Sequence, residues 1–389
     1  MRLQLTGGAL PIAVASALLG SLSTAAADGQ ARLASDVLVY TDTDSVVVFS
    51  PQVTAHRELD DDGGEVTARA VVDAVTAASV DVISNATYRF SEVRTELSTS
   101  LSKRIGQSLP TASYRWSSEP DYQSHGLGLG WRRRLAGGDA VASARYQLTL
   151  DRIGRVDTPP SRFSESLHSH AFEVGLTQTL DTSTLVRVVY TLTAQFGYME
   201  KPYRSVPLFD SAGLARAEAD GVALTLDTFE AYRLSARPPE EVPDDRFRHA
   251  LAVRGLRYVD RLDGALRLDY RFYGDSWGVL GHTLEPAFAR ALSDHYQLDL
   301  WSRLHVQSSA RFWQRAHLVA SPTSLPRWRT MDRSLSRSWH TTFGARLGYA
   351  RGAWVAYGEV SAMYSRFLEH LLIDRRLAII SQFGVRWSL

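Results

Sequence analysis

The amino-acid sequence predicts an all-β fold: a closed antiparallel transmembrane β-barrel of about 16 strands, with 14 as the alternative, behind an N-terminal signal peptide. Three observations predict it. Apolar and polar residues alternate over segments of about ten residues, many times along the chain. Short turns alternate with long polar connections, as periplasmic turns and extracellular loops do. The last segment, residues 377–389, has one apolar face with an aromatic residue near its end.

The N-terminal residues have the features of an export signal. Arg2 supplies a positive charge, residues 10–22 form a short apolar core, and Ala25, Ala26 and Ala27 offer an A-x-A cleavage site. We therefore expect residues 1–27 to be a cleaved signal peptide and residues 28–389 to form one barrel domain in the bacterial outer membrane.

The composition of the 389 residues agrees with an envelope protein. The absence of cysteine excludes a lipoprotein anchor and disulfide bonds, and a net charge of +1 gives no indication of a nucleic-acid partner. Nine Trp and 16 Tyr suit the aromatic girdles of a membrane barrel. The expected partners are outer-membrane lipid and the barrel assembly machinery. No cofactor is expected, and the oligomeric state stays open.

Alternation assigns faces to the strands. It is clearest in residues 296–307, where Leu298, Leu300 and Leu304 share one face and Asp299 and Arg303 share the other. Residues 66–74, 93–101, 142–150, 186–196 and 377–389 follow the same pattern. Residues 109–118 and 247–258 are weaker strands, because Ala112 and Arg254 obscure their faces.

The connections give an independent signal. Short turns are expected around residues 137–138, 181–182, 263–264, 293–294 and 351–352. Long polar connections are expected near residues 152–167, 198–246, 313–337 and 366–375. Counting strands back from residue 389 gives about 15, and residues 36–40 supply the even-numbered partner.

Charged residues fall on the faces opposite the apolar ones. A charge facing lipid at mid-bilayer costs roughly 2–4 kcal/mol, so we expect these side chains to line the lumen. They are Arg94, Arg145, Arg187, Arg267, Arg271, Arg303, Arg346 and Arg386, with Glu92, Glu96, Asp269, Glu285, Asp299 and Glu359. A soluble sandwich with a charged wet face is disfavoured, because ordinary strands average only about 5–6 residues.

Four stretches resemble a bacterial envelope family known as domain of unknown function 3570 (DUF3570). They are YTDTDSVVVFSP (residues 40–51), VDAVTAASVDVISNATYRFSEVR (72–94), SSEPDYQSHG (117–126) and GYMEKPYRSVPLF (197–209). The resemblance covers nearly all of the chain after the signal peptide. It implies an outer-membrane barrel and supplies no catalytic residue.

Small motifs suggest chemistry that the surrounding pattern does not support. Residues 274–278 match the G-x-S-x-G nucleophile elbow, but Ser276 lies between two alternating strands and the elbow needs a strand–turn–helix context. His168 and His170 have a metal-ligand spacing without a third ligand nearby. Asp42 and Asp44 suit either a calcium-binding turn or an ordinary turn.

The longest connection, residues 198–245, carries an apolar first part, residues 198–209. Its characteristic side chains are Tyr198, Lys201, Tyr203, Arg204 and Phe209. One interpretation folds this part inward as a constriction, with Arg204 meeting a lumen carboxylate such as Glu96 or Asp269. The other makes it an external cap on neighbouring loops. Residues 212–232 are expected to form a helix or a short hairpin.

The leading functional hypothesis is a passive or gated channel for small polar solutes, because a sheet of 16 strands encloses more space than its side chains fill. The alternative is a non-transporting structural barrel or the membrane partner of an export or redox system. A membrane-embedded hydrolase would rest on Ser276 alone, so we expect the protein not to be an enzyme.

Overall fold

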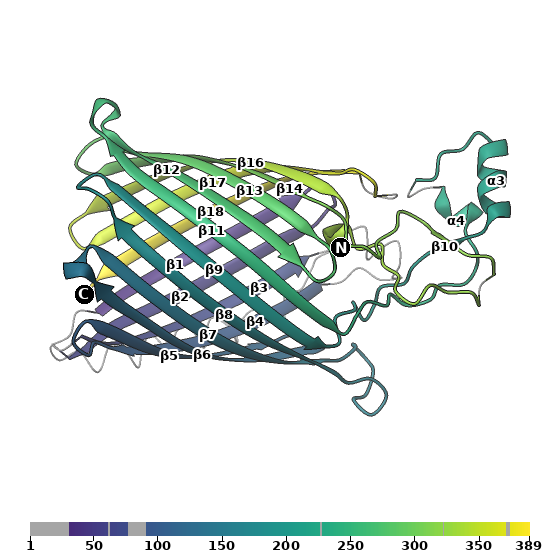
Figure 1. Cartoon of the computed structure of the whole chain (residues 1–389), viewed down its shortest axis with the longest axis horizontal. Helices are drawn as coiled ribbons and strands as arrows, with labels where there is room; N and C mark the ends of the chain where they lie inside the picture. Colours follow the sequence, from purple (N-terminus) through teal and green to yellow (C-terminus); the bar gives the residue numbers. More distant parts are fainter. Residues whose placement is uncertain (1–30, 61–62, 77–90, 226–227, 322, 371–373) are drawn as a thin grey trace, which may run out of the picture.

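Sixteen antiparallel strands form a closed barrel in the computed structural model, which describes residues 31–60, 63–76, 91–225, 228–321, 323–370 and 374–389 (Figure 1). The predicted fold and strand number are confirmed. The expected signal peptide, residues 1–27, lies outside the described residues.

Each barrel strand spans 11 to 15 residues, long enough to cross a bilayer when tilted. The strands are β1 (Ala31–Asp42), β2 (Val47–Asp60), β3 (Gly64–Thr76), β4 (Ser91–Lys103), β5 (Ser108–Ser118), β6 (Tyr122–Leu135), β7 (Ala140–Ile153), β8 (Glu165–Thr179), β9 (Thr184–Gly197), β11 (Asp245–Val259), β12 (Gly264–Asp275), β13 (Leu280–Ala291), β14 (Tyr296–Gln307), β16 (Ser338–Arg351), β17 (Trp354–Phe367) and β18 (Arg375–Ser388).

The barrel closes where β18 pairs with β1, and a side-chain contact reinforces this seam. Asp36 of β1 lies opposite Gly384 of β18, which lies opposite Tyr357 of β17. The Tyr357 hydroxyl crosses Gly384 and donates a hydrogen bond to Asp36. A Cβ atom at position 384 would clash with both side chains. Glycine at this position therefore permits a bond that joins three strands across the closure.

The outer face is apolar, as alternation predicts. In β14, Leu300 is 45% exposed and Leu304 48% exposed, and both extend away from the barrel. The weak strands are confirmed as β5 and β11. In β11 the alternation is hard to read because Ala250, Ala252 and Leu256 share the inner face with Arg254. Small or apolar residues on the lumen wall thus hide the period of this strand.

Tyrosine and histidine side chains pair on the outer face, between the middle of the strands and the loop end of the barrel. Four tyrosine hydroxyls lie within hydrogen-bond distance of a histidine Nδ1 on the neighbouring strand. The pairs are Tyr114–His125 (2.8 Å), Tyr146–His170 (2.9 Å), Tyr190–His249 (2.7 Å) and Tyr270–His282 (2.8 Å). Side chains with an apolar body and a polar tip suit the boundary between lipid and water.

The two ends of the barrel differ as predicted. One end carries short turns, two of which contain the 3₁₀ turns η1 (Ala136–Gly138) and η2 (Asp260–Leu262). The opposite end carries the long connections. The two longest, residues 198–244 and 308–337, extend beyond the rim and are called the cap below (Figure 1).

The cap contains its own secondary structure. Helices α3 (Ser211–Ala219) and α4 (Phe229–Tyr232) fall in the stretch expected to be helix or hairpin, and Asp210 caps α3 by accepting a hydrogen bond from the Gly213 N–H. Strand β10 (Leu208–Phe209) pairs with β15 (His317–Leu318), and η3 (Arg333–Leu335) precedes β16. No helix among the described residues is long and apolar enough to span a membrane.

Two apolar clusters hold the cap together. The first joins Val242, Ala310, Trp313 and Leu335 to Trp277 from the β12–β13 loop, and therefore lies next to the rim. The second is built from Val206, Phe209, Phe229 and Met331. Both combine residues from the two long connections, so these connections fold as one unit.

Candidate functional site

A row of charged side chains crosses the inner wall of the barrel along the hydrogen-bonding direction. Arg187 of β9 lies opposite Arg254 of β11, which lies opposite Asp269 of β12, and Asp269 lies opposite Glu285 of β13. Residues paired in register point to the same face, so these four side chains share the lumen wall. Their order along the wall is two cations followed by two anions.

A second row lies one inward-facing position nearer the loop end. Ala252 pairs with Arg271, Arg271 with Thr283, and Thr283 with His305. His305 pairs with His340 of β16, and their rings stack with centroids 5.7 Å apart. The small residues in this row leave space in front of the wall.

The two rows line a cavity of about 670 Å³, here called the main cavity. Its charged lining side chains come from β9, β11, β12, β13, β14 and β18. They are Arg187, Arg254, Arg271, Arg303 and Arg376 together with Asp269 and Glu285. Five arginines therefore face two carboxylates.

Both carboxylates of the main cavity are engaged by arginines. Asp269 receives two hydrogen bonds from Arg254, at 2.5 and 3.0 Å, and an ion pair from Arg267 at 3.1 Å. Glu285 binds Arg267 and Arg303, each at 2.6 Å. Bidentate guanidinium–carboxylate pairs fix both partners in orientation, so this part of the wall is a preorganised ion-pair network.

A second cavity of about 470 Å³, here called the glycine cavity, lies on the wall formed by β4 to β9. Its charged lining residues are Arg132, Arg145, Arg187 and Glu173. Gly130 lines it directly, and a Cβ at Gly128 would clash with Ser113. The alternating glycines of β6 thus make room beside the arginines.

A third cavity of about 360 Å³ has balanced charge, with Arg267, Arg303 and Arg346 against Glu285, Asp299 and Glu359. The Arg346–Glu359 ion pair measures 2.6 Å. Trp301 occupies the space above Gly344, where a Cβ would clash with its indole ring.

Four predicted lumen residues line none of these cavities: Glu92, Arg94 and Glu96 on β4, and Arg386 on β18. Arg94 forms a 2.5 Å ion pair with Asp73 of β3, and Glu96 forms a 3.3 Å ion pair with Arg115 of β5. The structure thus places the predicted charged residues on one face of the wall and brings nine of them into the main and third cavities: Arg187, Arg267, Asp269, Arg271, Glu285, Asp299, Arg303, Arg346 and Glu359.

The expected contact of Arg204 with Glu96 or Asp269 is wrong. Arg204 forms ion pairs with Glu240 at 3.3 Å and with Asp332 at 2.5 Å, both within the cap. Burial opposes ionisation of Asp332, but Arg204 and the Ser334 N–H more than offset it and lower the pKa of that carboxyl. Arg204 pairs within the cap because two acidic side chains, Glu240 and Asp332, are buried next to it.

The other side chains of residues 198–209 also contact loops. The Tyr203 hydroxyl donates to Asp121 and accepts from the Val156 N–H, and burial together with Asp121 raises the pKa of Tyr203 to about 12. Tyr198 packs edge-on against Phe163, with ring centroids 5.7 Å apart.

The last two of the five characteristic residues, Lys201 and Phe209, also make their contacts within the cap. The Lys201 N–H donates to Glu240, and Phe209 is fully buried in the second apolar cluster. These contacts match the external cap rather than the inward fold.

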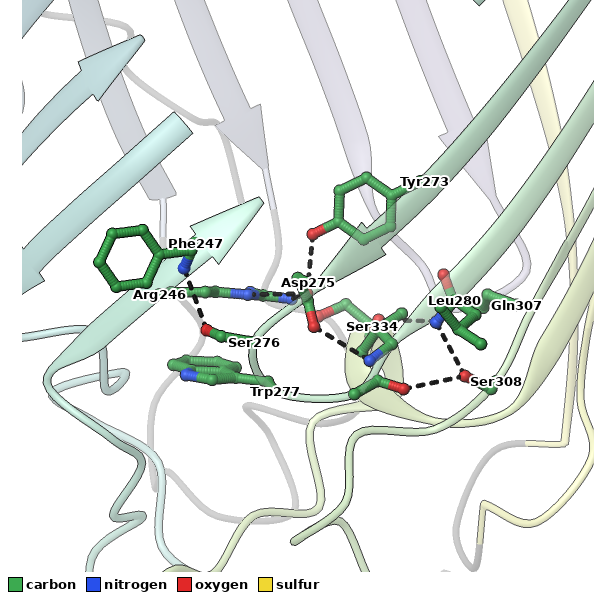
Figure 2. Close-up of polar contacts among 12 residues, drawn as sticks. Arg246, Phe247, Tyr273, Asp275, Ser276, Trp277, Leu280, Gln307, Ser308 and Ser334 are labelled. Atoms are coloured by element: carbon green, nitrogen blue, oxygen red, sulfur yellow. Dashed lines mark hydrogen bonds and ion pairs between the residues drawn. The ribbon is translucent and has the colours of Figure 1, made fainter. Parts of the chain in front are cut away.

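The G-x-S-x-G motif forms a strand–turn–strand, as predicted. Figure 2 shows Ser276 in the turn, where its hydroxyl accepts a hydrogen bond from the Phe247 N–H at 3.0 Å. Its neighbour Asp275 binds Arg246 at 2.5 Å, and Trp277 stacks 4.1 Å below the Arg246 guanidinium. The motif therefore anchors the base of the cap to β11.

The other small motifs are also occupied by structural contacts. Asp42 accepts hydrogen bonds from the Tyr40 hydroxyl and from the N–H groups of Asp44 and Val46, as a turn-forming aspartate does. Asp44 forms a 2.5 Å ion pair with Arg333 of the cap. His170 pairs with a tyrosine on the outer face, as described above. Among the described residues, His168 and His170 belong to no group of three side chains that could hold a metal ion.

Several residues of the main cavity escape sequence reasoning. Arg376 lies in a strand whose inner face is otherwise uncharged near that end, and Arg254 lies in a strand of obscure alternation. Arg132, the first of three consecutive arginines in β6, lines the glycine cavity. The missing signal is strand register, which places residues far apart in sequence into one row.

The closed sheet, the apolar outer face and the charged inner wall define a β-barrel of the outer-membrane type. The chain belongs to the family described as "Protein of unknown function (DUF3570)", which matches residues 157–366, more than half of the chain. The match includes the fourth of the resembling stretches, and the other three lie before it. No curated protein matches the sequence.

Solved barrels resemble the chain in fold. CdiB from Acinetobacter baumannii has a TM-score of 0.50 at 10% identity, covering 92% of this chain and 60% of CdiB. A bacterial polysaccharide outer membrane secretin scores 0.49 at 8% identity, covering 93% and 98%. OccK11 (OpdR) of Pseudomonas aeruginosa scores 0.42 at 9% identity, covering 93% and 96%. At such identities the likeness shows the fold alone.

Proposed function

We propose that this protein is an outer-membrane channel for small polar solutes, with its long loops outside the cell and the cap at the outer mouth. The observation that carries the proposal is the inner wall, where charged side chains line cavities of about 670, 470 and 360 Å³. A barrel that serves only as a scaffold has no need to line open space with ion pairs, because apolar or small side chains would fill it at lower desolvation cost.

The proposal includes the surroundings of the barrel. Lipid contacts the apolar outer face, and the barrel assembly machinery inserts the chain after export. Fractionation tests this part: the protein should co-purify with the outer membrane and show heat-modifiable gel mobility. Recovery as a soluble periplasmic protein would refute it.

Single-channel recording of the purified protein in a planar bilayer tests transport directly. We expect discrete conductance steps in potassium chloride that are absent from detergent alone and from heat-denatured protein. A correctly folded barrel that gives no steps would contradict the channel and favour the non-transporting alternative.

A further inference from the structure

We propose that the main cavity and the glycine cavity form one cationic binding track for small anionic solutes, those carrying carboxylate or phosphate groups. The inference rests on the proposed channel and specifies the class of solute that it takes. It begins from a local charge imbalance in a chain whose formal net charge is only +1.

The main cavity still has an excess of positive charge after the ion pairs of its two carboxylates are assigned. Asp269 and Glu285 are shared among Arg254, Arg267 and Arg303. Arg187 and Arg271 form no ion pair or side-chain hydrogen bond with any described residue, and both side chains are exposed to the lumen. Two guanidinium groups are thus left with their hydrogen-bond donors free.

Without a bound anion, Arg187 is expected to destabilise the pairing of its strand with β11. It lies directly opposite Arg254 in the β9–β11 ladder, and like charges opposite one another destabilise a strand pair. Nothing in the packing of β9 requires a cation at this position, because its other cross-strand neighbour is Thr177. An anion held between the guanidinium groups would remove the repulsion.

Arg187 also joins the two cavities, since it lines both. On the side of the glycine cavity it faces Arg132 and Arg145, with Glu173 as the one carboxylate lining that space. Arg145 is paired in register with Glu173 but forms no ion pair with it within the described structure. The excess of arginine therefore continues along the wall.

The balanced third cavity shows that the excess is local. There, three arginines face three carboxylates, so a passing anion meets no net attraction. Guanidinium groups bind carboxylate and phosphate through planar, paired hydrogen bonds, which makes arginine suited to such solutes. A cleft of one charge sign also concentrates the opposite ion, by about tenfold or more.

Reversal potentials across a bilayer with a potassium chloride gradient test the inference. The test variant is R187E/R271E, and R162E/R216E is the matched control, because it changes the same charge at exposed arginines of the loops. We expect anion selectivity in the wild type and in the control. In R187E/R271E the chloride-to-potassium permeability ratio should fall by roughly tenfold, the lower end of that field effect. Equal selectivity in all three would overturn the inference.

Blocking probes identify the solute class. Citrate and pyrophosphate, added to the wild type, should reduce the potassium chloride current at concentrations where spermidine does not. R187Q/R271Q, which removes charge without reversing it, should lose this block. Block by spermidine alone would overturn the inference.

The two proposals fail in distinguishable ways. Conductance without anion preference removes the anionic track and leaves the channel intact. If the folded wild type gives no conductance, calorimetric titration of the detergent-solubilised protein with citrate tests the track alone. Binding that R187Q/R271Q abolishes would support the track, and the absence of binding would overturn it.

Discussion

The substitution Leu300→Arg tests the assignment of faces, on which every lumen residue depends. Leu300 lies near the middle of β14, on the outer face between Phe288 and Ala345 of the neighbouring strands. An arginine on the lipid face costs about 2–4 kcal/mol at mid-bilayer, which shifts the folding equilibrium by about 30- to 900-fold.

Asp299→Arg, one residue earlier, is the matched control. It introduces the same side chain on the inner face, opposite Arg346 in the ladder. The cost there is the repulsion between like charges in a cross-strand pair, about 0.2–1 kcal/mol. The two variants should therefore differ by at least about 1 kcal/mol although they are adjacent in sequence.

Urea unfolding from phosphatidylcholine vesicles, followed by tryptophan fluorescence, measures both free energies. The chain has nine tryptophans, including Trp301 next to Leu300, so the signal follows unfolding of the whole protein. If Asp299→Arg were the more destabilising variant, the register of β14 would be shifted by one residue and the reasoning would be refuted.

Three further predictions address the seam and the cap. Gly384→Val should destabilise the barrel by about 1–3 kcal/mol in the same urea assay, because its side chain would overlap Tyr357 and Asp36, whereas Gly348→Ala, where a Cβ has ordinary room, should be nearly neutral. The pKa of Asp332 is lower in the folded protein than in the unfolded chain, so its contribution to stability is present above about pH 4 and is lost as the pH falls through the folded value. The protection of the amide hydrogens of residues 198–244, measured relative to their intrinsic exchange rates, should therefore fall at acidic pH, and should be low at all pH values in Arg204→Ala; an acid-insensitive protection would contradict this. Deletion of residues 199–243 should leave heat-modifiable mobility intact and increase conductance, and a barrel that no longer assembles would show that the cap is needed for folding.

Sequence predicts the wall of this barrel well because each face follows from local chemistry. Lipid requires apolar side chains at every second position, and that requirement acts on each strand separately. Leu300 and Asp299 are assigned correctly from alternation alone. The assignment weakens in β5 and in β11; in β11 the lumen face carries Ala250 and Ala252, because the inner face is not required to be polar.

The arrangement of the site could not be predicted in this way. Arg187 and Arg254 are separated in sequence by residues 198–244 of the cap, and only the register between β9 and β11 places them opposite each other. The partner of Arg204 was wrongly expected for the same reason. Its acids, Glu240 and Asp332, come from two loops that meet through buried apolar residues, and no periodicity indicates which loops will meet.

Net charge therefore describes a barrel of this kind poorly. The chain carries 43 basic and 42 acidic residues, a balance that by itself gives no indication of a charged partner. The sheet then sorts these charges by position: acids and bases neutralise each other in the third cavity, while Arg187 and Arg271 in the main cavity have no ion-pair partner in the described part of the chain. A solute inside the lumen is surrounded by the wall and lies within one Debye length, about 8 Å, of only a few side chains. In the proposed channel such a solute responds to this local excess, so we expect selectivity to depend on the rows that strand register brings together.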